Sequence, residues 1–286
     1  MLTRNHLYFR PRSLTEAVDT LSRHGGQILS GGTDFFPGLG DKPMPSSVVD
    51  LSGVGELREI SMDSDAIRIG GLATWTDILR ASLPPSFDAL KAAAREVGSI
   101  QIQNRGTIAG NLSNASPAAD GVPPLLVLDA EVELASTTGT RRLPLGEFIV
   151  GNRKTARRPD EVLSAVVIPR DLDEARSAFL KLGARRYLVI SIAMVAAIVK
   201  TDSVGRIQIA RVAVGSCSVT ARRLVTLESA LVGTPAQPGL GARALPEDLA
   251  ALSPIDDVRA TAAYRQDAAL TLVRRALEAC VEATEC

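Results

Sequence analysis

The residues best suited to ligand chemistry include a glycine pair that follows an apolar stretch near the start of the sequence. Residues 28–37 are Ile-Leu-Ser-Gly-Gly-Thr-Asp-Phe-Phe-Pro. Gly31 and Gly32 can adopt positive φ, and neither has a side chain that would keep a ligand at a distance. Such a turn can direct successive backbone N–H groups into one concavity, which suits a phosphate or diphosphate. A Gly-Gly pair also forms ordinary turns between strands, so this motif alone leaves both interpretations open.

A second segment of similar chemistry favours the ligand interpretation. Residues 107–111 are Thr-Ile-Ala-Gly-Asn, and residues 114–120 continue as Asn-Ala-Ser-Pro-Ala-Ala-Asp. The glycine loop at residues 30–34 and this second loop of small residues each follow an apolar stretch. Together they are expected to hold one extended dinucleotide from two sides.

The hydrophobic pattern predicts the elements that position these loops. Ser13 and Glu16 form a capping box at the start of a helix, which ends at Gly25-Gly26. Strands are predicted at residues 27–30 and 48–51, so the first glycine pair lies in a small α/β unit. A second unit is predicted from strands and helices at residues 66–71, 74–79, 86–97, 131–135 and 162–169.

The pattern changes after Asp173, where we place the main domain boundary. Three long β segments, which suggest an antiparallel sheet, are followed by two helical patterns. The β segments are predicted at residues 178–182, 190–200 and 207–215, and the helices at 221–231 and 257–283.

The composition is that of an ordinary globular protein, with 45% apolar and 22% charged residues among 286. Its 32 basic residues balance 32 acidic ones, which argues against a nucleic-acid partner. Cys217, Cys280 and Cys286 have no C-x-x-C spacing, which excludes a self-contained iron–sulfur or zinc site and suggests a reducing compartment. His6 and His24 are too few for a metal site.

No segment predicts export or membrane insertion. Residues 1–12 lack the apolar region of a signal peptide. The longest apolar run, residues 187–199, is interrupted by Ser191 and is too short to span a bilayer. We therefore expect a cytoplasmic protein without a membrane span.

Five motifs, in the same order along the chain, resemble those of one protein family. They lie at residues 30–34, 107–111, 115–120, 148–155 and 254–259, the last followed by Tyr264-Arg265. Over essentially its whole length the chain resembles the medium, flavin-binding subunit of the molybdenum hydroxylases, the group of xanthine dehydrogenase and carbon monoxide dehydrogenase. The family usually has Ala-Gly-Gly-Thr-Asp and Thr-Ile-Gly-Gly-Asn at the first two motifs, so Ala109 here replaces a glycine.

The resemblance implies an α+β fold. It predicts an FAD-binding unit of two α/β subdomains, of the PCMH/VAO type, at residues 1–56 and 57–173. A C-terminal domain with an antiparallel sheet and helices is predicted at residues 174–286.

The same resemblance implies an electron-transfer function. FAD on this chain would accept electrons from 2Fe–2S clusters on a small partner subunit, which receives them from a molybdopterin centre on a large partner. It would pass them to NAD, a quinone, a cytochrome or oxygen, in a dimer of heterotrimers. The organic substrate would bind to another polypeptide, so this sequence does not identify it. A free-standing FAD-dependent oxidoreductase and a flavin-less assembly module remain as alternatives.

The resemblance also predicts which residues contact FAD, and none is needed as a nucleophile or general base because the flavin carries the redox chemistry. The first motif would cradle the diphosphate through Ile28, Leu29, Ser30, Gly31, Gly32, Thr33, Asp34 and Phe35. From the other side, contacts are predicted for Thr107, Ala109, Gly110 and Asn111. Ala109 would be tolerated if its backbone is regular.

Further contacts are predicted downstream, each with a structural alternative. Asp120 would accept hydrogen bonds from ribityl or ribose hydroxyls, or it caps a helix. Lys181 would place a cation near the flavin ring, or it is a solvated strand lysine. Val162 and Leu163 would offer backbone contacts to adenine or the ring. Tyr187 and Trp75 are candidate stacking partners, although a lone aromatic residue is more often part of a core or interface.

Overall fold

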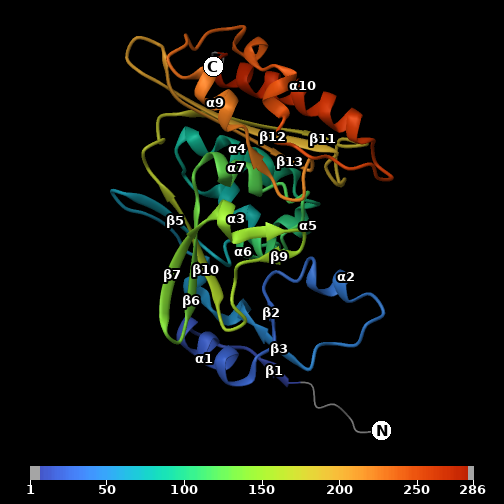
Figure 1. Ribbon diagram of the computed structural model, residues 1–286. Helices are drawn as coiled ribbons and strands as arrows, with labels where there is room; N and C mark the ends of the chain where they lie inside the picture. Colours follow the sequence, from blue (N-terminus) through green and yellow to red (C-terminus); the bar gives the residue numbers. More distant parts are fainter. Residues whose placement is uncertain (1–6, 283–286) are drawn as a thin grey trace.

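The fold is mixed α+β, as predicted, and it consists of three units stacked in sequence order (Figure 1). The computed structural model describes residues 7–282, so His6 and Cys286 lie outside the described residues. Each unit is built around its own sheet, of three, five and four strands in turn. In the described part of the chain, no helix combines the length and apolarity needed to cross a bilayer.

The N-terminal unit is the small α/β unit expected from the sequence. Its parallel sheet has the strand order β1-β3-β2. Ser13 caps the first helix by accepting a hydrogen bond from the Glu16 amide, and the helix buries Ala17, Val18 and Leu21. The elements are β1 (Leu7–Phe9), α1 (Leu14–His24), β2 (Gln27–Leu29), α2 (Phe35–Leu39) and β3 (Ser47–Asp50), followed by short 3-10 helices at Leu51–Gly53 and Gly55–Arg58.

The middle unit contains an antiparallel sheet of order β4-β5-β10-β6-β7, with β10 at its centre. Seven of the eight residues of β10 are buried, which explains its continuous apolar run. The elements are β4 (Ile60–Met62), β5 (Ala66–Gly70), α3 (Trp75–Arg80), a 3-10 turn (Pro85–Phe87), α4 (Asp88–Glu96), α5 (Ile100–Gln103), α6 (Ile108–Asn114), α7 (Val122–Val127), β6 (Glu131–Ser136), β7 (Gly139–Pro144), α8 (Leu145–Phe148), β8 (Ile149–Gly151), β9 (Lys154–Thr155) and β10 (Val162–Pro169).

The C-terminal unit has the predicted antiparallel sheet, in the order β11-β12-β13-β14. One face of the sheet lies on the helices of the middle unit and the other is covered by the long helix α10 (Figure 1). The elements are β11 (Arg176–Leu182), β12 (Ala193–Thr201), β13 (Ile207–Gly215), β14 (Arg222–Arg223), α9 (Val225–Leu231), 3-10 helices at Leu240–Arg243 and Pro246–Leu249, and α10 (Ala262–Val281).

Strand β12 shows how the last two units share a core. Met194, Ala196 and Ile198 belong to the apolar core of the middle unit, while Ala193 and Val195 belong to the core beneath α10. Alternate side chains of one strand point to opposite faces, so the strand is apolar throughout. Packing therefore continues across the boundary that we propose near Asp173.

Three sequence predictions need correction. The helix expected at residues 221–231 begins only at Val225, after the short strand β14 (Arg222–Arg223). Residues 107–111 do not form a loop: Thr107 is the N-cap of α6, and its side chain accepts a hydrogen bond from the Gly110 amide. The last helix begins at Ala262 rather than at residue 257, because Asp257 accepts backbone hydrogen bonds from Arg259 and Ala260 in a turn. Short side-chain-to-backbone bonds of this kind compete with helix formation.

Candidate dinucleotide-binding cleft

A cleft of about 1130 Å³ brings the two predicted binding motifs together. One side is formed by the first glycine motif and α2, and the other by the start of α6. Further lining comes from Arg153, Thr155 and Arg157, in and after the β8–β9 hairpin. The cleft is therefore assembled from segments that are distant in sequence.

The two glycines of the first motif are required for different reasons. A Cβ atom on Gly31 would lie 2.0 Å from the backbone oxygen of Arg105, so only glycine allows this close approach of two chain segments. Gly32 has φ +80°, in the region that favours glycine. Positive φ at both positions was possible from the sequence, but only Gly32 adopts it.

A hydroxyl pair connects the two motifs directly. Ser30 Oγ and Thr107 Oγ1 are 2.7 Å apart and form a hydrogen bond. Thr107 Oγ1 also accepts from the Gly110 amide at 3.1 Å, so this one side chain caps α6 and fixes the facing loop. Ala109 lies within α6 with a regular backbone, which explains why its methyl group is tolerated.

Asn111 supplies an acceptor without a partner. Its Oδ1 is buried and makes no hydrogen bond within residues 7–282, and the residue lines the cleft. A buried, unsatisfied polar atom costs about 1–3 kcal/mol. A hydroxyl or N–H donor on a bound ligand would satisfy it.

Comparison with known proteins identifies the kind of ligand. Residues 3–171 match the family described as the FAD-binding domain in molybdopterin dehydrogenase, and residues 178–280 match the CO dehydrogenase flavoprotein C-terminal domain. The chain belongs to this family of FAD-binding medium subunits. The family resemblance inferred from the five motifs is thereby confirmed.

Relatives and solved structures agree with the family assignment. The nicotinate dehydrogenase FAD-subunit of Eubacterium barkeri is 39% identical over 206 residues, which cover 69% of this chain and 70% of the relative. The nicotine 6-hydroxylase medium subunit of Paenarthrobacter nicotinovorans is 30% identical, covering 94% and 95%. Carbon monoxide dehydrogenase from Hydrogenophaga pseudoflava superposes with a TM-score of 0.87 at 26% identity, covering 98% of both chains. This chain is thus the FAD-binding subunit of a molybdenum hydroxylase-type oxidoreductase complex.

The cleft of this medium subunit fits a flavin dinucleotide. Gly31 and Gly32 line the cleft without side chains, and Asn111 offers an acceptor that no residue between 7 and 282 uses. Most of the predicted contact residues line the cleft, namely Ile28, Ser30, Gly31, Gly32, Thr33, Asp34, Phe35, Thr107, Ala109, Gly110, Asn111 and Leu163. Leu29 and Val162 are buried among core side chains and do not line it, so any contact from them would come from backbone atoms.

Asp120 and Lys181 lie outside the cleft lining and pair with each other. Lys181 Nζ is 2.6 Å from Asp120 Oδ2, and Ser191 Oγ donates to Asp120 Oδ1 at 2.6 Å. Burial raises the pKa of Asp120, while Lys181 and Ser191 oppose that shift. The structure contradicts both simpler alternatives, because Asp120 caps no helix and the Lys181 side chain is only 6% exposed. Their role toward the flavin stays a prediction.

The two candidate stacking residues differ in environment. Trp75 is 1% exposed and belongs to the core of the middle unit, although it also borders the cleft. Tyr187 is exposed on the loop between β11 and β12, where the Arg186 guanidinium lies 5.2 Å from its ring centroid. Sequence analysis assigned no role to Lys42, Arg153 or Arg157, which also line the cleft. The motif at residues 148–155 was the signal that could have directed attention to Arg153.

Proposed function

We propose that this medium subunit holds FAD in the cleft and transfers electrons within a molybdenum hydroxylase complex. The observation that supports it best is the joining of the two glycine motifs around one cleft by the Ser30–Thr107 hydrogen bond. FAD would supply the redox chemistry, accepting electrons from one partner and releasing them to an external acceptor. The chain itself would bind the cofactor, orient it and shield it from water.

The remaining redox centres are assigned to partner subunits. A 2Fe–2S cluster needs four ligands, usually cysteines, and this chain contains three cysteines in all. Cys217 and Cys280 are buried in the C-terminal unit. We therefore assign the 2Fe–2S clusters to a small subunit and molybdopterin to a large one. From the family resemblance we further propose a cytoplasmic dimer of heterotrimers. The family includes the medium chain of Hydrogenophaga pseudoflava carbon monoxide dehydrogenase, which supports this arrangement.

Two measurements test the proposal. The purified chain should show the visible absorption of bound flavin, and Gly32→Val should lose it, because valine strongly disfavours φ +80°. A circular dichroism spectrum like that of the wild type would show that the variant still folds. A wild-type chain that binds no FAD, or a Gly32→Val chain that retains it fully, would contradict the binding site.

Co-purification tests the electron-transfer part. A tagged chain expressed with its neighbouring reading frames should bring down one iron–sulfur chain and one molybdenum-containing chain. Addition of the organic substrate should then bleach the flavin absorption only in the complete complex. Bleaching of the isolated chain by a substrate of its own would instead favour the free-standing oxidoreductase, and co-purification without flavin would favour the assembly module.

A further inference from the structure

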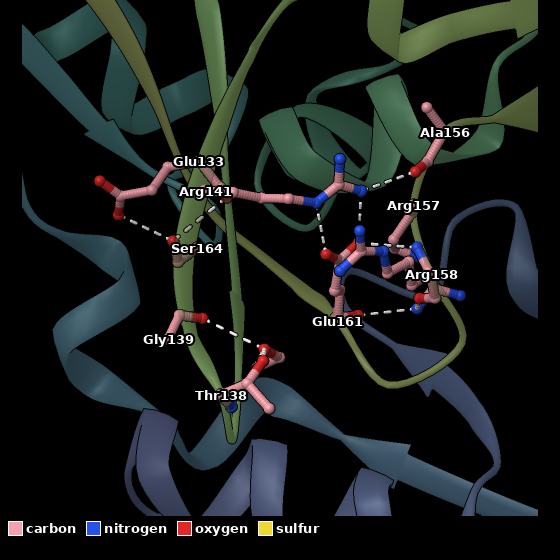
Figure 2. A network of polar contacts seen from close by, with 10 residues as sticks. Glu133, Thr138, Gly139, Arg141, Ala156, Arg157, Arg158, Glu161 and Ser164 are labelled. Atoms are coloured by element: carbon pink, nitrogen blue, oxygen red, sulfur yellow. Dashed lines mark hydrogen bonds and ion pairs between the residues drawn. The ribbon is translucent and has the colours of Figure 1, made fainter.

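The segment between β9 and β10, residues 156–161, contributes Arg157 to the cleft wall. None of the five sequence motifs covers this segment. Figure 2 shows the polar network that fixes this segment. The Glu161 carboxylate accepts hydrogen bonds from Arg141 Nε at 2.6 Å and Nη2 at 2.9 Å, and from the Arg158 amide at 2.7 Å. The Glu161 side chain is only 2% exposed, and both of its carboxylate oxygens are hydrogen-bonded to these partners. It therefore does not form a hydrogen bond through its carboxylate to the neighbouring Arg157.

Arg157 is held in place by backbone carbonyl groups alone. Its Nη1 donates to the oxygens of Glu161 at 2.7 Å, Arg158 at 3.0 Å and Pro159 at 3.4 Å. Its Nε and Nη2 make no hydrogen bond or ion pair with any residue between 7 and 282. Burial lowers the pKa of Arg157, and Glu161 and Asp160 oppose that shift. Because a guanidinium group stays protonated in proteins, Arg157 keeps its positive charge beside the cleft.

The charges that line the cleft are unbalanced. Lys42, Arg153 and Arg157 are positive and Asp34 is negative, so three positive charges less one negative charge leave a net charge of +2. Lys42 and Arg153 are exposed, and the Arg153 guanidinium also binds Asn114 Oδ1. Arg157 is half-buried, so solvent and salt screen its charge less. It is the best preorganised cation of the three.

We propose that Arg157 binds the cofactor, with its free Nε and Nη2 donating hydrogen bonds to the diphosphate of FAD from the segment that follows the β8–β9 hairpin. The inference rests on the proposed function, because it requires FAD in this cleft. Two donors on one planar group match two phosphate oxygens, and the carbonyl contacts at Nη1 set their direction before the ligand arrives. The diphosphate carries one negative charge on each phosphate, which matches the net charge of the lining.

Ligand titration of the full-length apo-chain tests this role. Arg157→Met is compared with Arg158→Met, which removes the same charge from an exposed neighbour outside the cleft lining. We expect Arg157→Met to weaken FAD and ADP binding about tenfold to a hundredfold, the range for a charged hydrogen bond. Riboflavin and adenosine, which lack phosphate, should bind as in the wild type. FAD affinity should also depend less on sodium chloride in Arg157→Met than in Arg158→Met.

The outcomes separate the possible failures. Equal FAD affinity of Arg157→Met and Arg158→Met would overturn the inference and leave the proposed function intact. Parallel weakening of all four ligands, or weakening of adenosine as much as ADP, would assign Arg157 to loop structure or to base binding and also overturn it. Arg157→Lys should regain part of the FAD affinity and the salt dependence, since it keeps the charge. A wild-type chain that binds no FAD would remove the proposed function, and this inference with it.

Discussion

Replacing Gly31 by alanine tests the close contact between the first glycine motif and the chain before α6. The new Cβ would lie 2.0 Å from the Arg105 oxygen and 2.8 Å from the Arg105 carbonyl carbon. Because such contacts are essentially never shorter than 3.0 Å, the two segments would have to separate by about 1 Å. The Ser30–Thr107 distance would then grow from 2.7 Å to about 3.7 Å, beyond hydrogen-bonding range.

The effect on cofactor binding follows from this displacement. If two hydrogen bonds to charged phosphate oxygens are lost at about 1.5 kcal/mol each, the cost is about 3 kcal/mol. That corresponds to a loss of FAD affinity of more than about a hundredfold. The assay is a titration of apo-protein with FAD, followed by flavin fluorescence, with urea unfolding of the same samples to measure stability.

Gly38→Ala is the matched control. Gly38 lines the same cleft, but an added Cβ would meet no atom within 4 Å, and its φ is not positive. We expect FAD affinity within about twofold of the wild type and slightly higher helix stability. If Gly31→Ala bound FAD as tightly as Gly38→Ala, the close approach at Arg105 would not matter for binding, and the description of the cleft would be wrong.

Two further substitutions have defined outcomes. Lys181→Met should cost about 3–5 kcal/mol of stability near neutral pH, because it leaves the buried Asp120 carboxylate without its cation. Burial raises the pKa of Asp120, so the native state keeps the Asp120 proton to higher pH than the unfolded state does. The loss of stability in Lys181→Met should therefore shrink as the pH falls toward the ordinary aspartate range. Urea unfolding of both proteins at pH 7 and pH 5 measures this loss, and a loss independent of pH would contradict the explanation. Ala109→Gly should lower stability by about 0.5–1 kcal/mol, because the residue is helical, and should not raise FAD affinity; tighter FAD binding in the titration would show that the methyl group does obstruct the cofactor.

Local sequence patterns predicted the elements well where an apolar run or a helix-capping residue marks them. Strand β10 has the predicted bounds, and two predicted helices are found as α1, capped by Ser13, and α3, capped by Thr74 at the start of the predicted range 74–79. The prediction failed at Thr107, where small residues that resemble a loop form the first turn of α6. A threonine N-cap followed by Ile-Ala-Gly fits either structure locally, and packing of Ile108 and Leu112 in the core selects the helix.

The residues of the candidate site were likewise predictable from the sequence only in part. The motifs themselves identified the family and most of the cleft-lining residues, because a diphosphate requires uncovered backbone and small side chains, and these leave a recognisable pattern. The pairing of Asp120 with Lys181 could not be predicted, since it joins residues 61 positions apart through the packing of the C-terminal sheet on the middle unit.

From the sequence alone came the class of fold, the two glycine motifs and the family, each of which depends on residue types at short spacing. Tertiary structure decided which glycine is needed for close approach and which for positive φ, since that depends on Arg105 lying against Gly31. It also decided which cations face the cleft. Arg157 and Arg158 are adjacent and chemically identical, yet only Arg157 lines the cleft. The fold makes the difference, because Glu161 binds the Arg158 amide through its carboxylate and the Arg157 guanidinium through its backbone oxygen as the chain enters β10.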